Sequence, residues 1–384
     1  MSLIATTATA NLDRAVPDLI ALSHRIHAHP ELKYEETRSS AWTAGILSDV
    51  GINVDVGVCD LPTAFVARVG NGPLHFSICA EYDALPAVGH ACGHNIIAAA
   101  AVGAALALAP LVDELGITLS VHGTPAEEGG GGKVYMLDRG AFDGVHASLM
   151  VHPGPTDGLR PRVSAVKHFE VRCTGHESHA AAAPHLGINA ADALTIAQVS
   201  IGLLRQHLRP TDQVHGIVLK GGDAANIIPA HTSADWMVRA RTVAELAELV
   251  PRVERCFEAG ALATGASVSF HDECPVYTHM EHDDDLVELY RTATEPLGRD
   301  YRGPDMTFST DMGNVSLAIP SIHPTIAIET AGAVNHQPEF AAACINASAD
   351  RAVRDGALGM AMTVINAATG QLRDRLLARG GYTR

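Results

Sequence analysis

The stretch Leu74–Asn95, LHFSICAEYDALPAVGHACGHN, decides how the first part of the chain folds. It opens with a period-two apolar run, Leu74–Ala80, that is typical of a β-strand. After it comes the alanine-rich run Ile96–Val112, which is short for a membrane span and contains Pro110. These features favour a helix buried in a protein core. The stretch therefore predicts a strand, a polar loop and a buried helix in direct succession.

Similar apolar runs recur on both sides of this stretch, and helical segments separate several of them. They are Ala64–Val69, Ile117–His122, Ala147–Val151 and, after a long interval, Thr325–Ile328. A helical segment from about Ser348 to Ala378 closes the chain. Strands that alternate with helices predict an α/β fold with a mainly parallel sheet and helices on both faces.

The middle of the chain has a different order of elements, β-α-β-β-α-β. The expected elements are a strand at Ala165–Cys173, a helix at Asn189–Leu208, strands at Val214–Leu219 and Ser233–Arg239, a helix at Val243–Leu262 and a strand at Ala266–His271. This is the order of a ferredoxin-like α+β unit, which can fold as its own domain. We therefore expect an inserted domain over residues 163–275, within a larger domain formed by residues 1–162 and 276–384.

Composition argues against several classes of function. The 27 Lys and Arg against 43 Asp and Glu give a net charge of −16, and no basic cluster is evident that could follow a phosphate backbone. The N-terminus shows no basic segment followed by a long apolar one, so no secretory signal is expected. The seven cysteines are scattered, which fits a reducing compartment better than a disulfide framework. We expect a cytoplasmic protein without a nucleic-acid or membrane partner.

Histidine, cysteine and carboxylate side chains follow the ends of four predicted strands. In open α/β sheets, binding sites form in the loops just beyond the C-terminal strand ends. The residues at these positions are Glu81, Asp83, His90, Cys92 and His94 in the first loop, Glu127 and Glu128 in the second, His152 in the third and His336 in the fourth. Taken singly, each has a simpler explanation as a core residue or a solvated turn. Their joint arrival at strand ends favours one shared site.

Thiolate, imidazole and carboxylate donors together suit zinc first, and cobalt or manganese as oxygen donors increase. No second Cys-x-x-Cys pair accompanies Cys92, so a zinc ribbon is not expected. The number of donors instead allows two ions about 3.5–4 Å apart, which would lower the pKa of water toward about 7. Within the pair Glu127–Glu128, one carboxylate can bind metal while the other accepts a proton from water. Gly129–Gly132 let the backbone pass close to such a site.

Longer motifs add a resemblance that covers nearly the whole chain, from HRIHAHPELKYEET near the N-terminus to NHQPEF near the end. The sequence resembles the aminoacylase and carboxypeptidase G family of dinuclear metallopeptidases and amidohydrolases, metallopeptidase family twenty. Within it, the branch with p-aminobenzoyl-glutamate hydrolase and β-alanyl-lysine dipeptidase is the most similar. The motifs that indicate this branch are AEYDALPAVGHACGHN, GTPAEEGGGGK, SHAAAAPHLGINAADAL, HGIVLKGGDAANIIP and STDMGNVS.

The resemblance implies a role for each matching position in the larger, catalytic domain. Cys92 matches a metal-bridging ligand, and the other matched ligands are His94, Glu128, His152 and His336. Glu127 matches the general base. Asp83 matches an acid that orients a ligating histidine, a support that metal sites usually need.

The resemblance also implies roles in the inserted domain, which would act as a lid and dimerisation domain. His179 matches a histidine that reaches the partner subunit's active site and stabilises the oxyanion, whereas Asn226 and Arg239 match residues that hold the substrate carboxylate. Taken by itself, Arg239 also has a simpler explanation as one partner of a surface ion pair. Two positions depart from the family: Asn95 replaces a common Asp, and Glu81 replaces a ligating His of the aminopeptidase members.

The combined expectation is a homodimeric, metal-dependent amidohydrolase with two divalent ions per subunit, zinc or manganese, with cobalt as a further option. Its small-molecule substrate would have an amide bond next to a free carboxylate, as in an N-acyl amino acid, an aryl-glutamate or a small dipeptide. The alternative is a catalytically silent relative that binds metal or a peptide-like ligand for regulation. Glu127 favours the enzyme, because a binding protein needs no base beside the ligand Glu128.

Overall fold

The computed structural model describes residues 2–303 and 306–384, and the chain divides into two compact units. Unit 1 combines the residues up to Arg162 with Met280–Arg384, and unit 2 is Val163–His279. Unit 2 thus ends at His279 rather than at residue 275. The reason is that Tyr277 exchanges two backbone hydrogen bonds with Val166, which extends unit 2 beyond its last strand.

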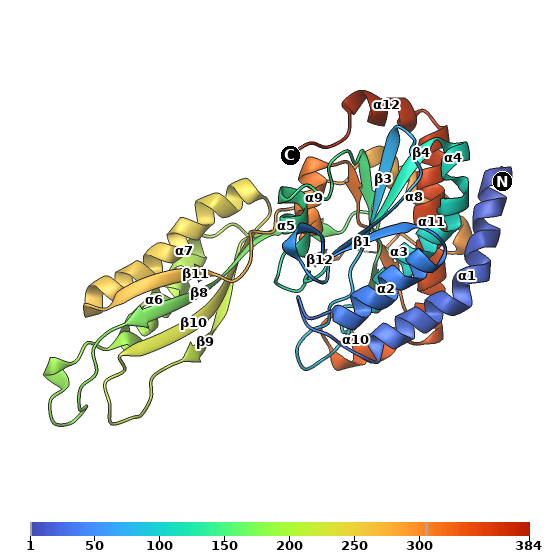
Figure 1. The fold of residues 1–384 in the computed structure, drawn as a ribbon. Helices are drawn as coiled ribbons and strands as arrows, with labels where there is room; N and C mark the ends of the chain where they lie inside the picture. The colour runs from blue at the N-terminus through green and yellow to red at the C-terminus, as the bar shows by residue number, and fades with distance from the viewer. Residues whose placement is uncertain (1, 304–305) are drawn as a thin grey trace. The chain divides into compact units, whose positions relative to one another are not determined.

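Unit 1 is built around a mostly parallel sheet, which has six strands in the part of the chain that the structure describes (Figure 1). In spatial order they are β1 (Asn53–Val56), β2 (Phe65–Val69), β4 (Ile117–Gly123), β3 (Leu74–Ala80), β5 (Ala147–Leu149) and β13 (Ser321–Ile322). β4, β3, β5 and β13 pair in parallel, whereas β2 pairs antiparallel with β1 and β4. The predicted α/β class with a mainly parallel sheet is therefore confirmed. The antiparallel edge follows from the short β1–β2 connection, which cannot form a crossover.

Two predicted strands are placed differently in the structure. Ala147–Val151 contains β5, after which the chain starts a new strand, β6 (His152–Gly154). The run Thr325–Ile328 contains β14 (Thr325–Ala327), which pairs in parallel with β6 rather than joining the main sheet. The main-sheet partner of β5 is β13, and its two residues are too few to show a period. A further two-stranded sheet joins β7 (Arg162–Val163) and β12 (Thr307–Phe308).

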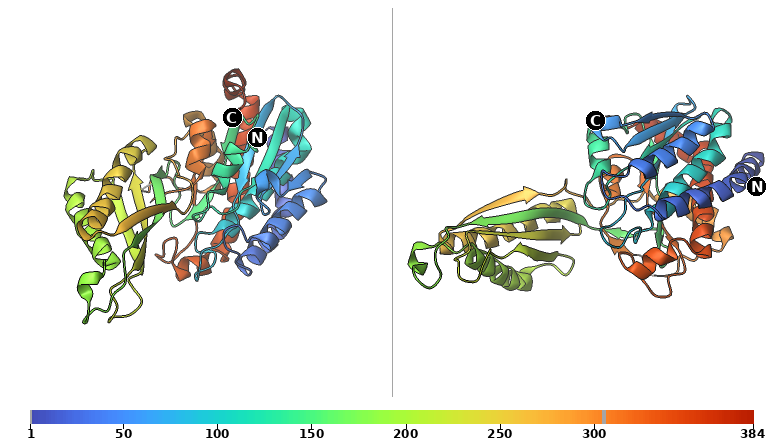
Figure 2. Two further views of the ribbon diagram at one scale, coloured as in Figure 1. Left: turned by 60° about the vertical axis from the view of Figure 1, so that its left-hand side comes forward. Right: turned by 60° about the horizontal axis from the view of Figure 1, so that its bottom comes forward.

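Helices α1 (Leu3–His27), α3 (His94–Leu108) and α11 (Ala347–Thr369) pack against one another, and α3 lies on β3 and β4 (Figures 1 and 2). The other helices of unit 1 are α2 (Thr37–Asp49), α4 (Val112–Leu115), α5 (Gly132–Asp138), α8 (Asp284–Thr294), α9 (Met312–Ala318), α10 (Pro338–Ala343) and α12 (Leu372–Arg379). The prediction of one closing helix was wrong in this detail: extended backbone at Gly370 separates α11 from α12.

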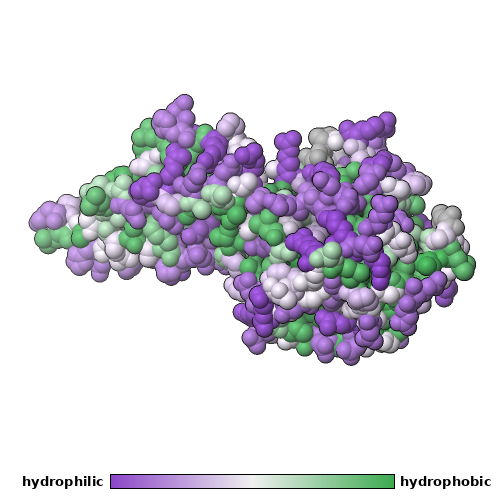
Figure 3. All heavy atoms as spheres, turned by 90° about the horizontal axis from the view of Figure 1, so that it is seen from above, coloured by the Kyte–Doolittle hydropathy of each residue, from purple (hydrophilic) through white to green (hydrophobic). Residues whose placement is uncertain are grey.

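Helix α3 is apolar on all sides, and nearly all of its residues are buried inside the protein. A helix can be apolar all round only when other elements enclose it. A Cβ atom added at Gly103 would lie 2.8 Å from Leu19 and 2.9 Å from Ala357, which shows how closely α1 and α11 approach it. By length and composition the stretch His94–Leu115 could cross a membrane, but 83% of its most apolar window is buried inside the protein. The predicted core helix is therefore present. On the face seen in Figure 3, by contrast, hydrophilic and hydrophobic residues are interspersed.

Unit 2 is a four-stranded antiparallel sheet with two helices, in the predicted order β-α-β-β-α-β (Figure 1). Its elements are β8 (Ala165–Thr174), α6 (Ala190–Leu204), β9 (Gln213–Lys220), β10 (His231–Ala240), α7 (Val243–Thr264) and β11 (Ser267–Asp272), with strand order β11-β8-β10-β9. Phe169, Trp236 and Phe257 form part of a core separate from that of unit 1. The ferredoxin-like arrangement is therefore confirmed, and it leaves β9 at an open edge of the sheet.

Candidate metal centre and active site

The five predicted metal ligands lie together in unit 1. Their donor atoms form two groups, Cys92–His94–His152 and Cys92–Glu128–His336, and within each group all donor atoms lie within 4.8 Å of one another. Cys92 is common to both groups. A donor shared by two adjacent groups is the arrangement that a bridging ligand between two cations needs.

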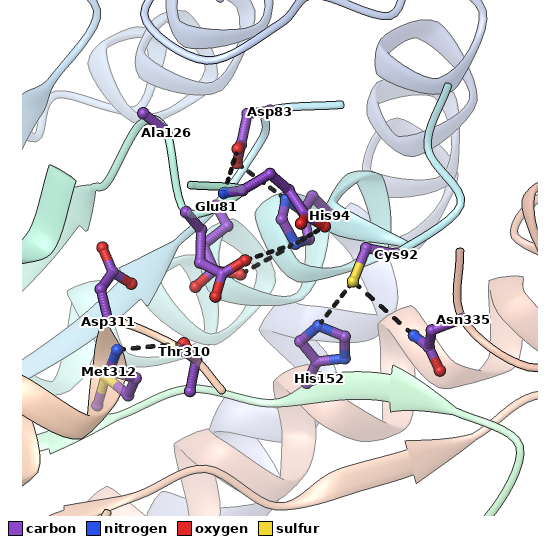
Figure 4. A network of polar contacts seen from close by, with 12 residues as sticks. Glu81, Asp83, Cys92, His94, Ala126, His152, Thr310, Asp311, Met312 and Asn335 are labelled. Carbon is purple, nitrogen blue, oxygen red and sulfur yellow. Dashed lines mark hydrogen bonds and ion pairs between the residues drawn. The ribbon is translucent and has the colours of Figure 1, made fainter. Parts of the chain in front are cut away.

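The sulfur of Cys92 points toward His152 and Asn335 (Figure 4). Its Sγ lies 3.5 Å from Nε2 of His152 and 3.7 Å from Nε2 of His336. Asn335, which sequence reasoning did not single out, places its side-chain amide 3.9 Å from the same sulfur. On the other side, Oε1 of Glu128 lies 3.7 Å from Nε2 of His336 and 3.9 Å from Nε2 of His94.

Each buried histidine presents one defined nitrogen to the site. Nδ1 of His94 lies 2.9 Å from the Asp83 carboxylate, and Nδ1 of His152 lies 2.8 Å from the carbonyl oxygen of Pro153. Because these acceptors require a proton on Nδ1, Nε2 of each ring is left as the ligand atom. Burial lowers the pKa of His152 to about 4, so its ring is neutral at neutral pH, which is the form that binds a metal.

The turn at Gly93 sets the direction of His94. Gly93 has a φ of +81° and precedes the first residue of α3. A Cβ atom at this position would lie 2.4 Å from Cγ of Pro153, so only glycine fits both the backbone conformation and the space. The strand-to-helix turn therefore orients Cys92 and His94 toward the same place from consecutive segments.

The loop with Glu127 and Glu128 is held by two buried acids from elsewhere in the chain. Oδ2 of Asp83 accepts a hydrogen bond of 2.9 Å from the backbone N–H of Glu128, so Asp83 supports both His94 and this loop. Oε1 of Glu36 accepts one of 2.8 Å from the backbone N–H of Ala126, whose φ is +59°. Glu36 lies in the HPELKYEET motif, but no pattern in the sequence assigned it this contact. The strained loop is therefore fixed from both sides.

Negative charge is crowded into this buried site. Burial raises the pKa of Glu127 well above its usual range, and the carboxylates of Glu81 and Glu128 raise it further. Burial would lower the pKa of His94, but Asp83 and Glu81 outweigh that effect and raise it well above its usual value. Both shifts show that the site lacks positive charge, which bound cations would supply.

The donor set fits two divalent ions. Among the described residues, the buried atoms without a hydrogen-bond partner include Oε2 of Glu81, Nε2 of His94 and Oε1 of Glu128. Unpaired buried polar atoms are costly unless a ligand satisfies them. The ligand set combines sulfur, nitrogen and oxygen donors from four loops, so the residues match the chemistry of zinc, manganese or cobalt.

The three predicted substrate residues belong to unit 2 and do not lie together there. Asn226 is next to the loop of His179, since its carbonyl oxygen accepts a hydrogen bond of 3.0 Å from the N–H of Ala180. Arg239 lies on β10, opposite Val166, near the start of unit 2. The loops of His179 and Asn226 flank the other end of β10, eight residues away at His231, or roughly 26 Å along a strand. Within one subunit, Arg239 therefore lies far from His179 and Asn226.

The sequence matches peptidase family M20/M25/M40 over residues 78–354. The chain belongs to this family. It is 35% identical to an Xaa-Arg dipeptidase of Mus musculus over 95% of this chain and 89% of the mouse protein. It is 32% identical to a subunit of p-aminobenzoyl-glutamate hydrolase of Escherichia coli K12 over 67% of this chain and 58% of that protein. The predicted family resemblance is confirmed.

The fold is shared with solved structures of the family. A dinuclear metal-binding M20 peptidase of Bacillus subtilis superposes with a TM-score of 0.70 at 21% identity, covering 92% of this chain and 98% of the other. This M20 family member is a hydrolase with the fold of dinuclear metal-dependent enzymes.

Proposed function

We propose that the protein hydrolyses an amide bond next to a free carboxylate in a small dipeptide, an N-acyl amino acid or an aryl-glutamate. The observation that carries the proposal is the pair of donor groups that share Cys92, with Glu127 beside them in the same buried site. Relatives named as an Xaa-Arg dipeptidase and a p-aminobenzoyl-glutamate hydrolase support this class of substrate.

Cys92, His94, Glu128, His152 and His336 would hold two divalent ions, which would polarise the substrate carbonyl and acidify water. Glu127 would take a proton from that water and pass it to the leaving amine. Oε2 of Glu127 lies 3.8 Å from Nε2 of His94, close enough for this carboxylate to reach water held beside that ligand. Its raised pKa would make it a stronger acceptor for that proton than an ordinary carboxylate.

His179 would donate a hydrogen bond to the oxyanion, and Asn226 and Arg239 would bind the substrate carboxylate. Because the ends of β10 are too far apart for one small substrate to touch both, a single unit 2 cannot supply all three contacts. Two copies of the chain can supply them together. The arrangement within unit 2 therefore favours a homodimer in which each active site receives residues from both chains.

Strand β9 would form the contact between the two subunits. It is an edge strand, and the side chains of Ile217, Val218 and Leu219 are 62%, 44% and 55% exposed. An exposed apolar edge strand is a template for pairing with another strand. A cytoplasmic location is supported by the seven cysteines, because no disulfide bond joins them in the part of the chain that the structure describes.

The test of the activity is a substrate panel with metal-loaded protein. The panel contains dipeptides, N-acyl amino acids and aryl-glutamates, and each free acid is compared with the same compound in which the carboxylate is converted to an amide. We expect turnover of free acids only, and loss of about 10²–10⁴-fold in kcat for Glu127→Gln with both metal equivalents retained. Absence of turnover across the panel would favour the regulatory binding protein.

Complementation tests the shared active site. Equal amounts of Glu127→Gln and His179→Ala chains, each inactive alone, are unfolded together and refolded. If His179 serves the partner's site, random pairing restores about a quarter of the wild-type activity. If it serves its own site, none returns.

A further inference from the structure

A fully buried lysine lies next to the ligand set, and the proposed mechanism does not use it. Lys133 is the second residue of α5 and has no solvent-exposed surface. Its Nζ lies 2.5 Å from Oε1 of Glu81 and 2.7 Å from Oδ1 of Asp311. Its backbone N–H donates to the other oxygen of Asp311 at 2.9 Å. A buried ammonium group is retained only when its charge is compensated, which these carboxylates do.

The position of Lys133 is fixed by the backbone before it. Gly132 begins α5, and a Cβ atom there would lie 1.9 Å from the carbonyl oxygen of Pro125. This close approach ties the start of α5 to the segment that leads into Glu127. Lys133 therefore cannot move independently of the loop that presents the proposed base.

Two carboxylates surround this one ammonium group, so one negative charge is left over. Asp311 alone would neutralise the charge of Lys133, and it already accepts hydrogen bonds from both the side chain and the backbone N–H of that residue. Glu81 adds a second carboxylate with only Oε1 engaged. A purely structural ion pair has no need of a second buried carboxylate with an unsatisfied oxygen.

The remaining oxygen of Glu81 is directed at the ligand set (Figure 4). Oε2 of Glu81 lies 3.4 Å from Nε2 of His94, and neither atom has a hydrogen-bond partner among residues 2–303 and 306–384. With Glu127, these side chains form a third group whose donor atoms lie within 4.8 Å of one another. When Nδ1 alone carries the proton, Nε2 of His94 offers a lone pair, and a cation bound between it and the carboxylate oxygen would satisfy both atoms.

We propose that Lys133 and Asp311 are positioning residues that hold Glu81, and that Oε2 of Glu81 is an additional oxygen ligand for the cation bound by His94. This inference rests on the proposed dinuclear site and deepens it. An oxygen donor from Glu81, which shares a donor group with His94, would raise the coordination number of that cation. Added oxygen donors shift preference from zinc toward manganese, which accepts five or six ligands.

The decisive variant is Glu81→Gln, because it leaves Lys133 and Asp311 as a neutral pair and is expected to fold. The assay titrates metal-free protein with Mn²⁺ or Zn²⁺ against a chromophoric chelator and resolves the two equivalents. We expect the affinity of one Mn²⁺ equivalent to fall at least about tenfold, with a smaller loss for Zn²⁺. The melting temperature of the metal-free protein should stay the same or rise, since an unsatisfied buried carboxylate is removed.

Lys133→Met should weaken the same equivalent, because an unsupported Glu81 no longer points to His94. Lys167→Met is the matched control: Lys167 also bridges two carboxylates, Glu254 at 3.4 Å and Asp272 at 3.2 Å, but in unit 2. This control should bind metal as the wild type does.

The proposal is overturned if Glu81→Gln binds both metals with wild-type affinities while its metal-free form melts at a lower temperature. That result would make Glu81 a structural partner of Lys133 only. Failure of the proposed dinuclear site would look different, since wild-type protein would then bind no pair of divalent ions in the same titration. Failure of the proposed hydrolysis would appear only as absent turnover in the substrate panel.

Discussion

Substitution Asp83→Asn tests whether one buried carboxylate organises both halves of the metal site. Burial would raise the pKa of Asp83, but the neighbouring His94 outweighs this effect and lowers it, so the group is ionised. One oxygen accepts from Nδ1–H of His94 and the other from the N–H of Glu128, each at 2.9 Å. Asparagine keeps the shape but replaces one acceptor by an NH₂ donor. The N–H group of either His94 or Glu128 then faces the NH₂ group of asparagine and loses its hydrogen-bond acceptor.

The expected magnitude follows from the loss of one buried hydrogen bond. An unsatisfied buried donor costs about 1–3 kcal/mol of unfolding free energy. Loss of the partner that orients a ligating histidine lowers metal affinity about 10–100-fold. If Asn turns its NH₂ toward His94, the ring can no longer hold its proton on Nδ1, and Nε2 is lost as a ligand atom. We therefore expect weaker binding of the cation at His94 together with lower stability.

The assay is a chelator competition with Mn²⁺ and Zn²⁺, combined with denaturant unfolding of the metal-free protein. Asp350→Asn is the matched control, because Asp350 makes a comparable contact of 2.8 Å with His24 at a partly exposed position. That variant should leave metal affinity unchanged. The reasoning is refuted if Asp83→Asn loses stability but binds both metals as tightly as the wild type.

Three further outcomes are expected. Gly93→Ala should lose bound metal and at least ~1 kcal/mol of unfolding free energy, because alanine is strained at this φ of +81° and its Cβ would meet Pro153. Metal analysis and denaturant unfolding measure the two losses, and a wild-type metal content would contradict the prediction. Burial lowers the pKa of His75 to about 3, below the value near 6.5 of the unfolded chain. The unfolded chain therefore binds the proton more tightly, and the unfolding free energy falls by up to ~5 kcal/mol as pH falls from 6.5 toward 3. His75→Gln should therefore show a smaller stability difference between pH 7 and pH 4.5 in denaturant unfolding, and an unchanged difference would refute this role. Phe257→Ala should destabilise unit 2 by ~3–5 kcal/mol while the metal affinity of unit 1 stays unchanged. Proteolysis measures the first effect and chelator competition the second. A parallel loss of metal affinity would argue against two independent cores.

Local patterns along the chain were sufficient for most of the secondary structure. The strand at Leu74–Ala80 and the buried helix that begins at His94 follow from apolar periodicity and alanine content, and the structure contains both. The ferredoxin-like order of unit 2 follows in the same way. The edge strand β13 could not be found by this route, because its two residues show no period.

By itself, the sequence determined the family, the α/β class with its inserted domain, and the gathering of candidate donors at strand ends, because these depend on short motifs and on periodicity. Only the tertiary structure decided which distant groups meet. Lys133 and Asp311 are 178 residues apart and Glu36 and Ala126 are 90 apart, and packing of the core alone brings each pair into hydrogen-bond range. It also decided how far Arg239 lies from His179 within one subunit, because pairing along β10 fixes that distance and no local motif does.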